Sequence, residues 1–189
     1  GCDTIVSYDI IQPAALTGSI VPTNLDCNGI CIGAGNLTPS GGIPSYNYAW
    51  STGATTQDVS GLCAGSFSVS ITDFLGCSVS IPLVITEPPV LAASIIGTDL
   101  LCNSVCDGAA DLTVTGGTTP YTYAWSNSSA SEDLTSLCAA TFTVTITDSK
   151  GCTVVSSIAI NQLTTVTASI VGTDESCNLA CDGEANLTA

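Results

Sequence analysis

The sequence predicts an all-β protein made of tandem modules. Three observations support this expectation: cysteines recur at a fixed interval, apolar residues alternate with serine and threonine, and turns rich in glycine and aspartate separate the alternating segments. Apolar residues that recur at a period of two indicate half-buried strands. No segment of the sequence shows the 3.6-residue period of an amphipathic helix.

The cysteines define the repeat. All 11 cysteines of the 189-residue chain fall into four classes, and neighbouring members of a class are separated by the same 75-residue period. The classes are Cys2, Cys77 and Cys152; Cys27, Cys102 and Cys177; Cys31, Cys106 and Cys181; and Cys63 and Cys138. Trp50 and Trp125 keep the same interval, as do the glycine pairs at 41–42 and 116–117. A fixed period of this length is the sequence signature of a repeat protein.

The repeat divides the chain into two complete modules, residues 13–87 and 88–162. The boundary is placed at Glu87-Pro88-Pro89, because paired prolines end a strand and stiffen a linker. Residues 1–12 are then expected to form the last strand of a preceding truncated module, and residues 163–189 the first strands of a following one. These cut points predict a segment of a longer array.

Each module is expected to contain six or seven short antiparallel strands. In the second module they are placed near residues 91–97, 109–115, 121–126, 131–136, 140–147 and 152–160, and in the first module one period earlier. Phe67, Val69 and Ile71 illustrate the pattern, since they alternate with serines. Short strands separated by turns are typical of an immunoglobulin-like sandwich. The predicted fold is therefore a tandem series of 75-residue immunoglobulin-like antiparallel β-sandwich modules.

The composition argues against several classes of function. The chain has one lysine or arginine in total, no histidine, and 16 acidic residues, which gives a net charge of −15. A single cation cannot neutralise the phosphates of a nucleic acid, and the lack of histidine removes Ser-His-Asp and Cys-His catalysis. No apolar run approaches the ~20 residues that span a bilayer. We therefore expect no nucleic-acid binding, no enzymatic activity and no membrane insertion.

The cysteine content indicates an extracellular or cell-surface protein, because disulfides persist in oxidising compartments. A tetrathiolate zinc site is the alternative use of four cysteines in each module. Their spacing, C-x3-C-x31-C-x13-C, separates the second pair too widely for a zinc knuckle. We therefore expect disulfides.

The pairing of the cysteines is reasoned from the predicted fold. In an immunoglobulin-like sandwich, the loop before the second strand and the loop before the sixth lie at the same end. This favours bonds between two of the classes, namely Cys31–Cys63 and Cys106–Cys138. The cysteines of the other two classes are then left to pair with one another. They pair either within a module, as Cys27–Cys77 and Cys102–Cys152, or with a neighbouring module, and the sequence leaves both alternatives open.

Several acidic residues lie around the cysteine loops. Four of them are calcium candidates: Asp99, Asp107, Asp174 and Asp182. No D-x-D-x-D-G loop is present, so solvated loop carboxylates are the favoured interpretation and no cofactor is expected apart from this calcium alternative. Asp73 and Asp148 lie in hairpin turns, where aspartate caps its own backbone, and we interpret them as caps rather than as catalysts.

Four positions fit motifs for sugar attachment. Asn36, Asn127 and Asn186 lie in N-x-S/T sequons, and Asp3-Thr4-Ile5 resembles a bacterial O-glycosylation site at Thr4. Trp50 and Trp125 could stack on sugars, but aromatic residues on the strands of a sandwich are interpreted as core.

One combination of motifs resembles a known family. It consists of Cys102-Asn-Ser-Val-Cys106-Asp-Gly, Gly116-Gly117-Thr-Thr-Pro120-Tyr-Thr-Tyr-Ala-Trp125, Leu137-Cys-Ala-Ala-Thr-Phe-Thr-Val-Thr-Ile-Thr-Asp148 and Gly151-Cys152. Together these are similar to the SprB repeat, and the resemblance extends over both full modules and both partial ones. SprB repeats occur in very long surface adhesins of Bacteroidota, including gliding-motility filaments, which are typically exported by type IX secretion. The resemblance implies a cell-surface setting and a filamentous or adhesive role, without catalytic residues.

Two classes of function remain. The favoured one is a structural or adhesive repeat segment of a long extracellular filament or surface adhesin, with modules in contact end to end at Gln12-Pro13, Glu87-Pro88-Pro89 and Gln162-Leu163. The alternative is a lectin-like or calcium-binding module repeated for avidity. The expected partners are copies of the same repeat or chain in a fibre, and surface glycans. With one lysine in the chain, the junctions are expected to rest on apolar contacts, backbone pairing or a disulfide rather than on ion pairs.

Overall fold

The computed structural model describes the chain except for residues 1–10, 103–104, 164–166, 175, 177–183 and 189. The described residues form 14 strands and no helix, so they include no helix that could cross a membrane. The predicted all-β class is confirmed.

The chain divides into two compact units. The first unit consists of Gly1–Ala92, Val114–Thr122 and Thr147–Val154, and the second consists of Ala93–Thr113, Tyr123–Ile146 and Val155–Ala189. The first unit therefore contains the strands of the first repeat together with two turns that the sequence assigns to the second repeat.

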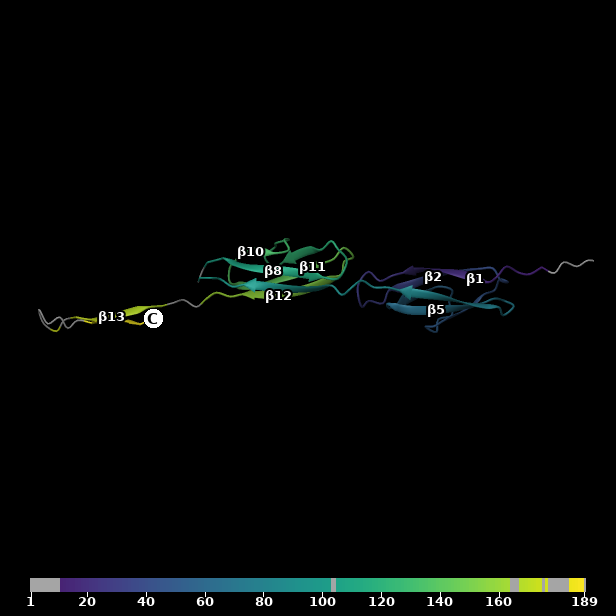
Figure 1. The fold of residues 1–189 in the computed structure, drawn as a ribbon, viewed down its shortest axis with the longest axis horizontal. Helices are drawn as coiled ribbons and strands as arrows, with labels where there is room; N and C mark the ends of the chain where they lie inside the picture. Colours follow the sequence, from purple (N-terminus) through teal and green to yellow (C-terminus); the bar gives the residue numbers. More distant parts are fainter. Residues whose placement is uncertain (1–10, 103–104, 164–166, 175, 177–183, 189) are drawn as a thin grey trace, which may run out of the picture. The chain divides into compact units, whose positions relative to one another are not determined.

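The first repeat folds into two three-stranded antiparallel sheets. One sheet has the order β1 (Thr17–Thr23), β2 (Gly33–Ser40), β4 (Val59–Leu62), and the other has the order β3 (Asn47–Trp50), β5 (Gly65–Thr72), β6 (Ser78–Ile85). In the lettering of the immunoglobulin fold these are the A-B-E and C-F-G sheets, without strand D. Figure 1 shows β1 and β2 in one layer and β5 in the other.

Alternate residues of both sheets build the core of this sandwich. Leu37 of β2 is 1% exposed, and Val69 and Ile71 of β5 are fully buried. Phe67, the third member of the alternating run, is partly buried and packs against the same cluster. The period of two in the sequence therefore identified the buried face of β5.

The second repeat has the same strand order. The sheets are β7 (Ala92–Thr98), β8 (Gly108–Thr115), β10 (Leu134–Leu137) and β9 (Thr122–Trp125), β11 (Ala140–Thr147), β12 (Thr153–Ile160). Buried residues recur at the positions of the first repeat, so that Leu112, Val144 and Ile146 correspond to Leu37, Val69 and Ile71.

A further two-stranded sheet consists of β13 (Ser169–Thr173) and β14 (Glu184–Thr188). Ser169 pairs with Thr188, and two periods earlier Ser19 of β1 pairs with Thr38 of β2. The β13–β14 pair therefore repeats the first strand pairing of a repeat in the same register.

One predicted strand begins later than expected. The sequence placed it near residues 56–61, whereas β4 begins at Val59. The reason lies in two side chains that precede it. Asp58 Oδ1 accepts a hydrogen bond of 2.9 Å from Leu37 N, and Gln57 Nε2 donates one of 2.7 Å to Leu37 O. These side chains take the place of the backbone partner that a longer strand would have supplied to Leu37.

Candidate functional site

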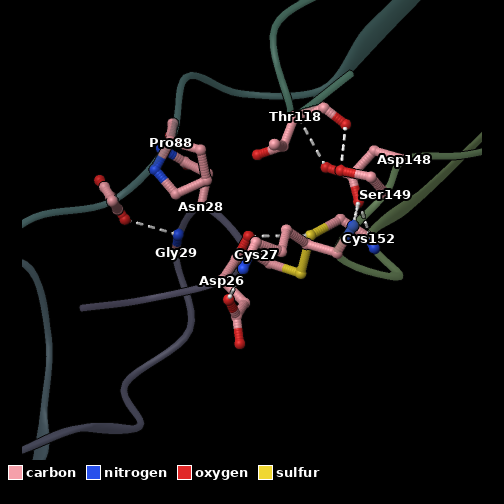
Figure 2. The surroundings of a disulfide bond; sticks show 11 residues. Asp26, Cys27, Asn28, Gly29, Pro88, Thr118, Asp148, Ser149 and Cys152 are labelled. Carbon is pink, nitrogen blue, oxygen red and sulfur yellow. Dashed lines mark hydrogen bonds and ion pairs between the residues drawn. A yellow bond between two sulfur atoms is a disulfide. The ribbon is translucent and has the colours of Figure 1, made fainter. Parts of the chain in front are cut away.

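The candidate site surrounds the disulfide between Cys27 and Cys152 (Figure 2). Cys27 lies between β1 and β2, and Cys152 lies in the turn between β11 and β12. The two residues are 125 positions apart in sequence, and their Cα atoms are 5.7 Å apart, within the usual range for a disulfide. Both belong to the first compact unit.

A buried carboxylate organises the turn that holds Cys152. Asp148 is 4% exposed. Its Oδ1 accepts hydrogen bonds of 2.9 Å from the backbone N–H groups of Lys150 and Cys152. Its Oδ2 accepts one of 2.9 Å from Thr118 N, as Figure 2 shows. The backbone N–H of Asp148 donates to Cys152 O at 2.9 Å. Asp148 therefore fixes the backbone on both sides of the peptide unit that carries the bonded cysteine.

The charge state of this carboxylate follows from the same contacts. Burial is the largest influence on Asp148 and by itself raises its pKa, but the backbone hydrogen bonds from Thr118, Cys152 and Lys150 outweigh it, so the pKa lies below 3.8. In the first repeat, hydrogen bonds led by that from Ile43 N hold the pKa of Asp73 below 3.8. The interpretation of both aspartates as turn caps is confirmed.

The residues after Cys27, on the other side of the disulfide, are hydrogen-bonded to the segment that follows β6. Asn28 Nδ2 donates a hydrogen bond of 3.0 Å to Pro88 O, and Gly29 N donates one of 2.8 Å to Glu87 Oε2 (Figure 2). The Glu-Pro segment that the sequence identified as a linker thus contacts the residues directly after Cys27.

The single lysine of the chain lies in this cluster. Lys150 Nζ is 3.1 Å from Asp26 Oδ1, and the two side chains are 51% and 55% exposed. Exposed pairs of this kind contribute about 0–1 kcal/mol. The contact between the two repeats thus includes a disulfide, one of the kinds of contact expected there, together with one exposed ion pair, because the single lysine lies two residues before Cys152 and its partner lies one residue before Cys27.

A hollow of about 360 Å³ lies beside the disulfide. Its lining consists of Cys27, Asn28, Val90, Leu91, Gly151, Cys152 and Thr153. Apart from the two bonded cysteines, this lining holds no ionisable side chain. The hollow therefore offers no acid–base pair, and the chemistry of the site is that of a covalent cross-link.

Two further disulfides close the sandwiches. Cys31 is bonded to Cys63 in the first repeat, and Cys106 to Cys138 in the second. Gly33 at the start of β2 pairs with Leu62 at the end of β4, so the first of these bonds joins neighbouring strands of one sheet. It differs from the inter-sheet disulfide of antibody domains, which joins strands B and F.

The within-module alternative for the remaining cysteines is contradicted by the structure. Neither Cys27–Cys77 nor Cys102–Cys152 is formed, because Cys27 is bonded to Cys152 while Cys77 and Cys102 are exposed free thiols. The structure has the other alternative, in which a cysteine of one repeat bonds with a neighbouring repeat.

The length of β6 explains why the within-module bond does not form. Leu25 N donates to Thr86 O at 3.0 Å, which places the Cys27 segment at the end of β6. Cys77 directly precedes the first residue of the same strand, Ser78–Ile85. Eight residues of strand span roughly 26 Å at ~3.3 Å per residue. A Cys27–Cys77 bond would have to cross that distance.

The three calcium candidates that the structure describes do not form part of a cluster of metal ligands. Asp99 accepts hydrogen bonds from Asn161 N at 2.8 Å and from its Nδ2, and Asp107 Oδ1 accepts one from Leu101 N at 3.2 Å. Asp174 is exposed, and Asp182 lies outside the described residues. Across the part of the chain that the structure describes, no three acidic or cysteine side chains gather as metal ligands.

The positions for sugar contact and attachment separate into two groups. Trp50 and Trp125 are each 4% exposed, and each Nε1 donates to a backbone carbonyl at 2.9 Å, which confirms their interpretation as core. The sequon residues are exposed: Asn36 on β2, Asn127 after β9 and Asn186 on β14. Thr4 lies outside the described residues.

A signal for the partner of Cys27 was present in the sequence. Asp26 precedes Cys27, and Lys150 lies two residues before Cys152. The corresponding positions one period away hold Leu101 and Leu75. Of the cysteines in these two classes, only Cys27 and Cys152 have side chains of opposite charge close to them in sequence. Complementary charges at positions that hold leucine in the other repeat are a reason to expect contact between these two segments.

These features define a class of protein: a disulfide-linked, tandem immunoglobulin-like repeat protein with a buried tryptophan on strand C of each repeat. A family model described as SprB repeat matches residues 95–130. The chain therefore contains a SprB repeat, as its motifs predicted.

No curated protein matches the chain. Similar solved structures include the C-terminal 282-residue fragment of intimin in complex with the translocated intimin receptor (Tir) intimin-binding domain, at 15% identity and a TM-score of 0.42, covering 84% of this chain and 67% of that one. A structure on Dscam isoform specificity is 13% identical with a TM-score of 0.35, covering 80% and 47%. The amphioxus IgVJ-C2 molecule is 12% identical with a TM-score of 0.31, covering 80% and 99%.

Proposed function

We propose that this chain is a structural and adhesive repeat segment of a long extracellular filament or surface adhesin, in which tension passes from repeat to repeat through disulfides as well as through the backbone. The observation that carries the proposal is the Cys27–Cys152 bond, which joins a cysteine of the first repeat to one of the second. The SprB repeat at residues 95–130 supports a cell-surface location, as do disulfides that require an oxidising compartment.

The bond changes how the chain responds to tension. When the two ends are pulled apart, force reaches Cys27, crosses the disulfide and leaves at Cys152. The backbone between them, which includes the sandwich strands of both repeats from β2 to β11, lies outside the covalent path of the force. A segment built in this way can lose its fold under load without lengthening between these two cysteines. That property suits a fibre and serves no evident purpose in an isolated binding domain.

A lectin-like role lacks comparable support, because the tryptophans that could stack on a sugar are buried. A calcium-binding role lacks it too, since Asp99 and Asp107 already accept hydrogen bonds from the chain itself. Glycan-array binding by the full chain measures the first of these alternatives. Specific binding there would favour the recognition function over the structural one.

The proposal is tested by stretching the full chain from its two ends in an optical trap. The wild-type chain in oxidising buffer is expected to release almost no length between residues 27 and 152. The Cys27→Ser/Cys152→Ser variant is expected to release about 60 residues, or about 200 Å at ~3.5 Å per residue, because the other two disulfides still close their own loops. Reduction of all disulfides should raise this to about 125 residues, or about 440 Å.

The Cys31→Ser/Cys63→Ser variant is the matched control, since it also removes one disulfide but leaves the Cys27–Cys152 bond in place. It should release as little length in oxidising buffer as the wild type does. If the wild-type chain released as much length as the Cys27→Ser/Cys152→Ser variant, tension would not pass through the disulfide and the proposal would be wrong.

A further inference from the structure

We propose that Cys77 and Cys102 are halves of further disulfides of the Cys27–Cys152 kind, each formed with a second copy of this chain, so that successive copies are cross-linked. The inference rests on the proposed function and names the partner of two exposed sites. Cys77 is the counterpart of Cys152, and Cys102 is the counterpart of Cys27, each one period away. Among the described cysteines of these two classes, the structure therefore holds one bonded pair, Cys27–Cys152, and two unbonded members, Cys77 and Cys102.

The turn around Cys77 has the same hydrogen bonds as the turn around Cys152. Cys77 N donates to Asp73 Oδ1 at 2.9 Å, and Asp73 N donates to Cys77 O at 2.9 Å. Cys152 makes both bonds with Asp148 at the same distances. The backbone that presents the thiol of Cys77 is therefore already in the arrangement that the bonded cysteine adopts.

Exposed apolar side chains lie beside each free thiol. Phe74 and Leu75, which precede Cys77, are 70% and 64% exposed, and Leu101, which precedes Cys102, is 73% exposed. Large apolar side chains that are exposed together mark surfaces that associate with a partner. Each of the two free thiols thus lies next to a surface without a partner among the described residues.

The identity of these side chains indicates which partner fits. Leu75 occupies the position of Lys150, and Leu101 occupies the position of Asp26. In the bonded pair these two positions face each other as an ion pair of 3.1 Å. A Cys102–Cys77 bond between two copies would therefore place leucine opposite leucine where the Cys27–Cys152 bond has aspartate opposite lysine. The occupant that matches both the thiol and the apolar side chain is a second copy of this chain.

Formation of each bond is a two-electron oxidation. The thiolate of one cysteine attacks a disulfide donor such as oxidised glutathione and forms a mixed disulfide, releasing one glutathione thiolate. The thiolate of the second cysteine then attacks the protein sulfur of the mixed disulfide and releases the other. Two protein thiols become one disulfide, and one molecule of oxidised glutathione becomes two of glutathione.

The test uses the full chain in a Cys2→Ser/Cys177→Ser/Cys181→Ser background, so that Cys77 and Cys102 are the reactive thiols. Equal amounts of unlabelled and ¹⁵N-labelled chain are mixed in a buffer of reduced and oxidised glutathione. Non-reducing electrophoresis and peptide mapping then identify the linked cysteines. We expect a reducible ladder of multimers in which Cys77 of one isotopic form is linked to Cys102 of the other. The Cys77→Ser and Cys102→Ser variants should both abolish the ladder.

A pair of charge variants tests the choice of partner. Leu101→Asp in one chain should lower the yield of Cys102–Cys77 links several-fold, and mixing it with a Leu75→Lys chain should restore the yield. The inference is overturned if both thiols stay free for alkylation in monomers. It is also overturned if Cys77–Cys77 and Cys102–Cys102 links form as often as Cys77–Cys102 links. Neither result would affect the stretching experiment, which measures the Cys27–Cys152 bond within one chain.

Discussion

Replacing both Cys31 and Cys63 with serine should lower the stability of the first sandwich and leave the second almost unchanged. The bond joins the start of β2 to the end of β4 and closes a loop of 32 residues. Substituting both cysteines removes the cross-link without leaving a free thiol to pair elsewhere.

The size of the effect follows from the loop length. In the chain-entropy description, a cross-link that closes a loop of this length contributes about 3–4 kcal/mol, because it reduces the freedom of the unfolded chain. A change of about 1 kcal/mol shifts the melting temperature of a domain of this size class by about 4–8 °C. The melting transition of the first sandwich is therefore expected to fall by about 15–25 °C.

Differential scanning calorimetry of the full chain measures this change, and the second repeat supplies a matched control. The Cys106–Cys138 bond closes a loop of the same length, 32 residues. The Cys31→Ser/Cys63→Ser and Cys106→Ser/Cys138→Ser variants should each lower one of two transitions by a similar amount. A shift of less than about 5 °C in both variants would show that the bonds do not constrain the unfolded chain as argued here.

Three further predictions concern the turns and the ion pair. Gly41→Ala should lower the free energy of unfolding far more than Gly76→Ala. Both glycines have positive φ, which costs about 1–2 kcal/mol for alanine, but only at Gly41 does the added Cβ collide with backbone atoms. Urea unfolding of the two variants measures the difference. The pKa of Asp148 is lowered from 3.8 in the folded state, so its contribution to stability is present above that value and is lost as pH falls through the folded pKa. The urea midpoint, measured from pH 7 to pH 2, should therefore fall less steeply in Asp148→Asn than in the wild type. Lys150→Gln removes the exposed ion pair with Asp26 and should change the unfolding free energy by less than about 1 kcal/mol, and the difference should shrink as salt is added. A larger effect would mean that the pair is more than a surface contact.

Much of the fold could be predicted because its determinants are local. A residue such as Val69 must face the core if its neighbours in the strand are serines that face outward, and this alternation is visible without knowing the partner strands. The caps at Asp73 and Asp148 are local in part, since Oδ1 of each carboxylate accepts from backbone N–H groups within four residues, whereas Oδ2 accepts from a donor 30 residues earlier in the chain. The late start of β4 escaped prediction because Asp58 and its neighbour bond with Leu37, which is distant in sequence.

The sequence by itself determined the period of the repeat, the strands and the grouping of the cysteines into classes, because each depends on spacing along the chain. Only the tertiary structure decided which members of two classes bond. Cys77 and Cys152 are equivalent in sequence, and either could in principle be the partner of Cys27. The eight-residue strand β6 holds Cys77 and the Cys27 segment at opposite ends, whereas the Asp148 turn brings Cys152 to a Cα–Cα distance of 5.7 Å from Cys27. A disulfide requires proximity in space, and that is set by how the strands pair and where the turns between them lie.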